Sequence, residues 1–162
     1  MTQREGQAWN ILATVEDPEI PVISVVELGI IRSVAELNGV LKVEITPTYS
    51  GCPATQVIED SVIEALNQAI LSPFEVSTVL SPPWSTTMIS ESGRQKLLEY
   101  GIAPPESDSV DKQALTGEER QIPCPLCKSK NTKMVSQFGS TPCKSHFKCL
   151  DCLEPFDYFK CL

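Results

Sequence analysis

The chain has 162 residues, of which 41% are hydrophobic, and this is enough for one ordinary domain and a small second one. Its formal net charge of -8 argues against sequence-independent nucleic-acid binding, which depends on clustered Lys and Arg. No apolar run approaches the roughly 20 residues of a membrane span, and the first ten residues lack the apolar region of a signal peptide. We therefore expect a cytoplasmic protein without a nucleic-acid or membrane partner, whose thiols stay reduced.

The beginning of the chain predicts a helix followed by a β-hairpin. Apolar residues at helical spacing favour a helix over residues 4–16, and the two prolines of Asp17-Pro-Glu-Ile-Pro21 end it. Residues 30–37 and 40–46 read as two strands, the second with alternating buried and wet positions. Asn38-Gly39 between them is typical of a type I′ turn, because both residues tolerate a positive φ.

A second helix and a third strand complete an expected α+β domain. An apolar stripe predicts an amphipathic helix over about 54–70, with Pro53 at its first position. Residues 74–80 favour a third strand, which gives a small three-stranded mixed sheet with flanking helices. Residues 89–100 favour a further helix, for which Thr86 and Thr87 are candidate caps.

The remaining sequence changes character twice, which predicts three parts: a first domain over 1–104, an acidic linker over 105–121 and a small Cys-rich β module over 122–162. The linker has many acidic and few large apolar residues. Lysines gather toward the C-terminus, and a solvated face or a partner surface would each explain them.

Four cysteines in the last part form two Cys-x-x-Cys pairs, Cys124 with Cys127 and Cys149 with Cys152. Two such turns make a tetrahedral four-sulfur site, which suits zinc or an iron–sulfur cluster. We expect structural zinc in a zinc ribbon, because a closed four-thiolate site leaves no position for a substrate. About forty residues cannot build a sufficient core alone, so the metal should be needed for folding.

Three nearby residues are weaker ligand candidates. Cys143 and Cys161 could replace a ligand, but ordinary buried thiols are the simpler interpretation because four ligands suffice. His146, the single histidine of the chain, lies between the cysteines, and we expect it to be a solvated surface residue.

A second candidate site lies at Cys52, between a strand and a helix. The positive end of the helix dipole and free backbone N–H groups lower a thiol's pKa there, which would make Cys52 a soft-metal ligand or a nucleophile. No histidine of the first part can pair with it, and this weakens a hydrolase hypothesis. Simple capping of the helix remains the alternative. Asp17 and Glu19 form a carboxylate pair in a proline-bounded turn, where Asp commonly serves only to start the turn.

These motifs together resemble a known family. Asp17-Pro-Glu19-Ile-Pro-Val, Glu27-Leu-Gly-Ile30, Thr46-Pro-Thr-Tyr-Ser-Gly-Cys52-Pro53 and Pro82-Pro-Trp84 resemble the domain of SufT-like iron–sulfur assembly factors, over about residues 5–104. The linker and the cysteine module resemble the PaaD (PaaJ) family, components of bacterial phenylacetate degradation that are encoded with the multicomponent phenylacetyl-CoA epoxidase. Most SufT-like proteins lack such a ribbon.

The resemblance implies a non-catalytic accessory protein that assembles or repairs iron–sulfur clusters in the epoxidase system. It implies that Cys52 is a reactive thiol that handles metal or a transient cluster, with Asp17 and Glu19 in an acidic motif. The implied partners are epoxidase subunits, above all the iron–sulfur flavin reductase, and a homodimer stays open. A zinc-ribbon adaptor without metal handling at Cys52, or an electron-transfer subunit with a cluster on the ribbon cysteines, remain alternatives.

Overall fold

The computed structural model describes residues 1–105 and 121–160, and these belong to two compact units, Met1–Gly93 and Arg94–Leu162. The acidic segment 106–120 and Cys161 lie outside the described residues. The expected domain limits of 1–104, 105–121 and 122–162 therefore stay a prediction. Within the described ranges, no helix combines the length and the apolar character that crossing a membrane requires.

The first unit is an α+β domain with one three-stranded sheet in the order β1-β2-β3, as expected. Strands β1 and β2 are antiparallel, and β2 and β3 are parallel, so the sheet is mixed. Its helices and strands are α1 (Gln3–Leu12), β1 (Ile31–Leu37), β2 (Val40–Ile45), α2 (Thr55–Gln68) and β3 (Phe74–Thr78), followed by a short 3-10 turn, η1 (Thr86–Met88), and the start of α3 (Glu91–Glu99).

The hairpin between β1 and β2 follows the predicted turn chemistry. Asn38 and Gly39 both have positive φ, 51° and 80°, as a type I′ turn requires. The turn fixes the register, and Leu37 pairs with Val40 directly beside it. This register sends Leu41, Val43 and Ile45 of β2 into the core.

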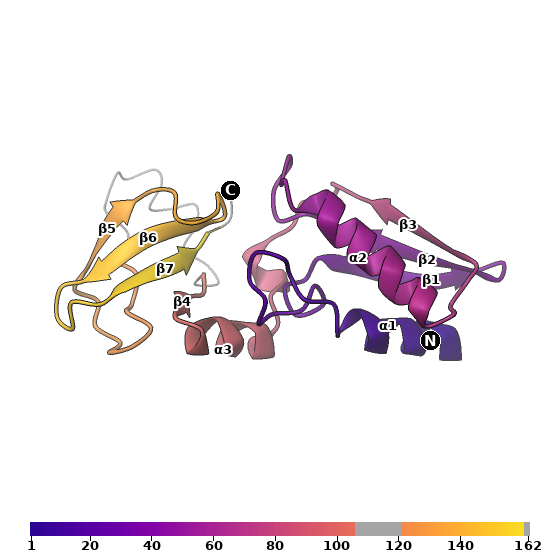
Figure 1. Cartoon of the computed structure of the whole chain (residues 1–162), viewed down its shortest axis with the longest axis horizontal. Helices are drawn as coiled ribbons and strands as arrows, with labels where there is room; N and C mark the ends of the chain where they lie inside the picture. Colours follow the sequence, from indigo (N-terminus) through magenta and orange to yellow (C-terminus); the bar gives the residue numbers. More distant parts are fainter. Residues whose placement is uncertain (106–120, 161–162) are drawn as a thin grey trace. The chain divides into compact units, whose positions relative to one another are not determined.

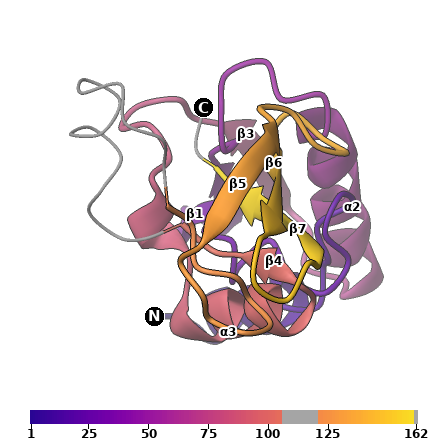
Figure 2. The same ribbon diagram turned by 90° about the vertical axis from the view of Figure 1, so that its left-hand side faces the viewer.

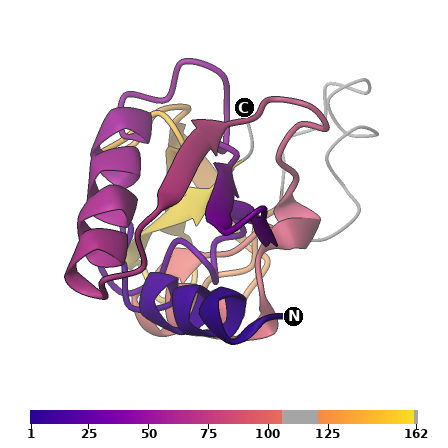
Figure 3. The same ribbon diagram turned by 90° about the vertical axis from the view of Figure 1, so that its right-hand side faces the viewer.

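The helices of the first unit cover this core. Helix α1 contacts α2 and β1, and α2 contacts β3 (Figure 1 and Figure 3). The inner stripe of α2 is Ile58, Val62 and Leu66, which repeats every four residues and is buried. This buried stripe fixes which face of α2 lies toward the core. The N-terminal end of α2 is joined directly to the segment that follows β2.

Two details of the predicted helix starts are wrong. Helix α2 begins at Thr55 with Ala54 as its N-cap, so Pro53 precedes the helix and does not occupy its first turn. Thr86 and Thr87 lie in η1 and do not cap α3. Instead, the side-chain oxygen of Ser90 accepts a hydrogen bond from the backbone N–H of Gly93 at 3.0 Å, which is the pattern of an N-cap.

The second unit contains a four-stranded sheet in the order β4-β7-β6-β5. Figure 2 shows the three long strands side by side. Strands β5, β6 and β7 form an antiparallel meander, and β4 adds to the edge of β7 in parallel. The stacked rings of Phe147 and Phe156 pack beside Tyr158 in its core. The strands are β4 (Ile102–Ala103), β5 (Thr132–Ser136), β6 (Lys144–Cys149) and β7 (Pro155–Phe159).

Candidate metal centre and assembly site

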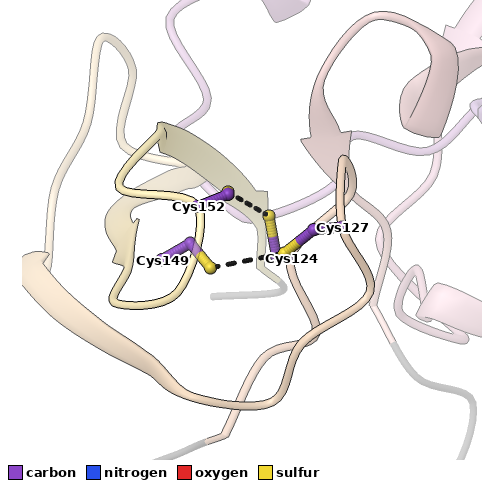
Figure 4. A group of neighbouring side chains, drawn as sticks. All are labelled: Cys124, Cys127, Cys149 and Cys152. Carbon is purple, nitrogen blue, oxygen red and sulfur yellow. Dashed lines mark hydrogen bonds between the residues drawn. The ribbon is translucent and has the colours of Figure 1, made fainter.

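The four cysteines of the two Cys-x-x-Cys pairs converge on one point of the second unit. Their sulfur atoms all lie within 4.8 Å of one another (Figure 4). Two of the sulfur–sulfur distances are 3.7 Å, between Cys124 and Cys152, and 3.5 Å, between Cys127 and Cys149. A zinc ion with four Zn–S bonds of about 2.3 Å has sulfurs about 3.8 Å apart, from tetrahedral geometry. The four side chains therefore fit a single tetrahedral metal ion.

The two cysteine turns have the same backbone geometry, although their sequences differ. The N–H of Cys124 donates to the carbonyl of Ser129, and the N–H of Cys149 donates to the carbonyl of Glu154, each five residues further along the chain. The residue after each second cysteine, Lys128 or Leu153, has a positive φ of 63° or 67°. The backbone therefore curls around each pair of sulfurs in the same way, as in a zinc knuckle.

Backbone N–H groups donate to the cysteine sulfurs, and the thiols differ in pKa. The N–H of Cys152, followed by the N–H of Asp151, lowers the pKa of the Cys149 thiol to about 7. Cys152 accepts from the N–H of Glu154, but desolvation and the sulfurs of its neighbours outweigh this bond and raise its pKa to about 12. Backbone N–H groups thus favour the thiolate of Cys149, the form that binds a metal.

A side-chain link joins the two cysteine turns, and we did not predict it. The carboxylate of Asp151, inside the second Cys-x-x-Cys pair, accepts hydrogen bonds from the Ser129 hydroxyl and, at 2.7 Å, from the Asn131 amide. These bonds lower the pKa of Asp151, with Ser129 as the larger cause. The N–H of Leu150 also donates to the carbonyl of Asn131 at 2.8 Å. An Asp inside the pair, with Ser and Asn shortly after the first pair, is the only sequence signal of this link.

Two of the other candidate ligands, Cys143 and His146, lie apart from this group, and Cys161 is outside the described residues. Cys143 is buried just before β6 with its sulfur 3.1 Å from the Thr141 hydroxyl, and it is absent from the four-sulfur group of the described residues. The Nδ1 atom of His146 lies 3.0 Å from a carboxylate oxygen of Asp157, its register partner on β7. The side chain of His146 is partly exposed, as expected. Its acidic partner was not predicted from the sequence.

Cys52 occupies the turn between β2 and α2, just before the helix begins. Its N–H donates to the carbonyl of Tyr49 at 3.3 Å, and its carbonyl accepts from the N–H of Thr55 at 3.2 Å. Gly51 before it has a φ of 84°, a conformation that favours glycine. The side chain of Cys52 is half-buried, and no side chain caps the start of α2. Cys52 therefore lies in the turn that leads into α2, three residues before the helix begins, and its thiol is partly accessible.

Asp17 forms the base of a closed loop between α1 and β1. One carboxylate oxygen accepts from the N–H groups of Glu19 and Ile20, both at 2.9 Å. The N–H of Asp17 donates to the carbonyl of Ile23, and Glu16 and Ser24 form a β-bridge. The predicted turn is present. One oxygen of the buried Asp17 carboxylate stabilises it by accepting hydrogen bonds from backbone N–H groups of the turn. Asp17 and Cys52 thus lie in two different loops, one before β1 and one after β2.

Comparison with known families matches each half of the chain separately. The family described as "Iron-sulfur cluster assembly protein" matches residues 5–79, and the family described as "PaaD zinc beta ribbon domain" matches residues 108–160. The first match contains Asp17, Glu19 and Cys52, and the second contains all four ribbon cysteines.

Individual proteins give the same division. A protein of Staphylococcus aureus named "Fe-S protein maturation auxiliary factor SufT" is 38% identical over 46% of this chain and 85% of its own length. The crystal structure of a DUF59 domain of unknown function from Bacillus anthracis superimposes with a TM-score of 0.54 at 30% identity, over 58% of this chain and 91% of that one. The fold of the first unit is therefore the DUF59 fold.

One relative spans both halves. An Escherichia coli protein, named as a putative subunit of 1,2-phenylacetyl-CoA epoxidase, is 39% identical over 96% of this chain and 92% of its own length. The chain therefore belongs to the PaaD family, that of the Escherichia coli epoxidase protein, in which an iron–sulfur cluster assembly domain precedes a zinc β-ribbon.

Proposed function

We propose that the chain is a non-catalytic accessory factor that assembles or matures iron–sulfur clusters in a phenylacetyl-CoA epoxidase system. The observation that carries this proposal is the pairing, in one chain, of an iron–sulfur assembly domain with a ribbon of the PaaD type. The names of the relatives agree with both parts, since they are maturation factors on one side and an epoxidase subunit on the other. Iron and sulfide are cargo in this role.

Cys52 is the proposed cargo-handling residue. Its half-buried thiol lies in the turn before α2, inside the segment that matches the iron–sulfur cluster assembly family. A partly exposed thiol suits a transient ligand, because a partner protein has to reach it to take the cargo away. We include Asp17 and Glu19 in this site, with Asp17 chiefly fixing the loop, since one of its oxygens already binds two backbone N–H groups.

The ribbon is the proposed docking module, and its four cysteines hold structural zinc. The sulfurs surround one point closely enough for all four to contact a single ion. A four-iron cluster would place each cysteine on a different iron and hold the sulfurs further apart. Zinc bound there would fix the two turns relative to each other, which stabilises a unit with a small core.

The proposed client is an epoxidase subunit, above all the iron–sulfur flavin reductase. A reductase of this kind needs a cluster, and it would belong to the same epoxidase system as the Escherichia coli relative. An adaptor without metal handling at Cys52 is the main alternative, and an electron-transfer subunit with a ribbon cluster is the other.

The deciding experiment measures cluster loading of the client. The reductase is co-expressed with the wild-type chain, with Cys52→Ser or with Cys143→Ser as a matched thiol control, and its iron and sulfide content is determined after purification without oxygen. We expect Cys52→Ser to lower the loading and Cys143→Ser to leave it unchanged. Equal loading with Cys52→Ser would exclude cargo handling by Cys52 and favour the adaptor hypothesis. A brown wild-type chain that keeps its colour in Cys52→Ser would place a cluster on the ribbon.

A further inference from the structure

The ribbon differs in charge from the rest of the chain. Residues 121–160 contain six lysines against three acidic residues, Asp151, Glu154 and Asp157. Residues 1–93 contain three basic residues against twelve acidic ones, so the net charges of residues 121–160 and of the first unit are opposite in sign. The ribbon is thus a basic module in an acidic protein, and its lysines need a physical cause.

Two of these lysines form a pair that costs stability. Lys133 on β5 and Lys148 on β6 are direct register partners, which places their side chains next to each other on one face of the sheet. Like charges directly opposite each other on neighbouring strands repel. Both side chains are exposed, and neither has an ion pair among the described residues.

The lysine pair lies on the outer face of the ribbon sheet. The neighbouring register pairs, Thr132 with Cys149 and Met134 with Phe147, place the buried Cys149 and Phe147 on the opposite face. The lysines can therefore project to solvent without touching the ribbon core or the sulfur ligands.

An apolar group adjoins this pair. Leu150 follows Lys148 and Cys149, and its N–H is bonded to Asn131, which directly precedes β5. Leu150 is exposed, and so is Pro155, the register partner of Lys148 on β7. The lysine pair can attract an acidic partner, and the exposed apolar groups beside it offer area that a protein partner can bury.

We infer that Lys133 and Lys148, with Leu150 and Pro155, form the surface by which the ribbon docks to an acidic face of its client protein. Carboxylates of a partner would relieve the repulsion between the two lysines. The free energy that this repulsion costs in the free chain would then favour binding. A protein fits better than a nucleic acid because two lysines supply few phosphate contacts, whereas the exposed Leu150 and Pro155 offer apolar area that a protein surface can cover. This inference rests on the docking role proposed above for the ribbon.

Charge reversal of one lysine tests the surface without unfolding it. Lys148→Glu places a carboxylate opposite Lys133 and replaces a repulsion by a cross-strand ion pair, so the thermal midpoint of the zinc-loaded chain should stay equal or rise. Lys42→Glu is the control for net charge, since it makes the same change on β2 of the first unit. It also replaces the exposed Lys42–Glu75 ion pair by a like-charge pair, so its thermal midpoint should fall, and binding is compared well below that midpoint.

The binding of the full-length, zinc-loaded chain to purified epoxidase reductase is measured at several salt concentrations. We expect Lys148→Glu to raise the Kd about tenfold and to reduce its salt dependence, whereas Lys42→Glu changes the Kd less than about twofold. An unchanged Kd for Lys148→Glu, in a chain whose binding is lost when residues 122–162 are deleted, would overturn the inference and leave the docking role intact.

Two further outcomes would overturn the inference in different ways. Full binding by the chain that lacks residues 122–162 would overturn both the inference and the docking role of the ribbon. A duplex oligonucleotide is measured in parallel, and its binding by the wild type but not by Lys148→Glu, without reductase binding, would replace the acidic protein by a nucleic acid.

Discussion

Lys128 and Leu153 occupy the same place in the two cysteine turns of the ribbon and share a left-handed backbone, with φ of 63° and 67°. Glycine adopts this conformation without strain, whereas other residues lose roughly 1 kcal/mol. Lys128 gains something in return, because its ammonium group donates to the carbonyl of Pro125 at 2.8 Å. Leu153 is 64% exposed and makes no comparable bond among the described residues.

Replacement of Leu153 by glycine should therefore stabilise the ribbon. We expect Leu153→Gly to raise the free energy of unfolding of the zinc-loaded chain by about 0.5–1 kcal/mol, measured by denaturant titration. Leu126→Gly is the control, since Leu126 is equally exposed in the first turn but lacks a positive φ. That variant should be neutral or less stable, and a gain in both variants would rule out relief of backbone strain.

The four-sulfur geometry predicts which cysteines matter for metal binding. Cys149→Ser removes one of the four converging sulfurs and should abolish stoichiometric binding of zinc. Cys143→Ser should keep one zinc per chain, because its sulfur lies outside the group. The zinc content per chain of both variants is measured by metal analysis after dialysis. Loss of zinc in Cys143→Ser would mean that Cys143 is a ligand, the arrangement that its spacing left open.

A carboxylate network at the N-terminus predicts one acid-sensitive step. The Thr2 hydroxyl and the Arg4 guanidinium lower the pKa of Glu36, and the backbone N–H groups of Glu36 and Thr2 lower the pKa of Glu5. Both carboxylates therefore stabilise the folded state above their unfolded pKa of about 4.3. This contribution is lost as the pH falls through the lower pKa values of the folded state.

NMR titration of the side-chain carboxyl resonances checks this step directly. Glu36→Gln should remove the part of the acid-dependent stability that Glu36 supplies, and it should move the midpoint of Glu5 as well, because the two share Thr2. Midpoints of Glu5 and Glu36 at or above the unfolded value would contradict the network.

Trp84 of the Pro-Pro-Trp motif supports the loop that precedes β1. Its indole N–H donates to the carbonyl of Leu28 at 3.0 Å, and the side chain is buried. Trp84→Phe leaves this carbonyl without that donor and should cost about 1–3 kcal/mol of unfolding free energy in urea. Trp9→Phe, at a half-buried position of α1, should cost less. Equal losses in the two variants would assign the effect to lost ring volume alone.

Local chemistry made much of the fold predictable. Asn38-Gly39 indicated the hairpin, since few other pairs accept two positive φ values, and the stripe of α2 indicated its buried face. The paired cysteines likewise indicated the four-sulfur group, because each pair points two sulfurs at one spot.

The missed features depend on contacts that spacing does not encode. Ser90 caps α3, although Thr86 and Thr87 were the predicted caps, because those two residues form the separate turn η1. The link through Asp151 needs the second cysteine turn to lie beside Asn131, which only the folded ribbon provides. Lys128 and Leu153 have a left-handed backbone, but neither residue is a glycine, so their residue types did not indicate this conformation.

The short strand β4 has a consequence for how the chain can be divided. Ile102 and Ala103 are buried and pair with Asp157 and Tyr158 of β7, so the ribbon sheet takes its fourth strand from residues that precede 106–120. A fragment cut at the limits of the ribbon family, 108–160, would keep all four cysteines of the four-sulfur group but expose one edge of β7. Such an edge invites pairing between molecules. A fragment that starts at Arg94 would include β4 and so carry its own protection of this edge.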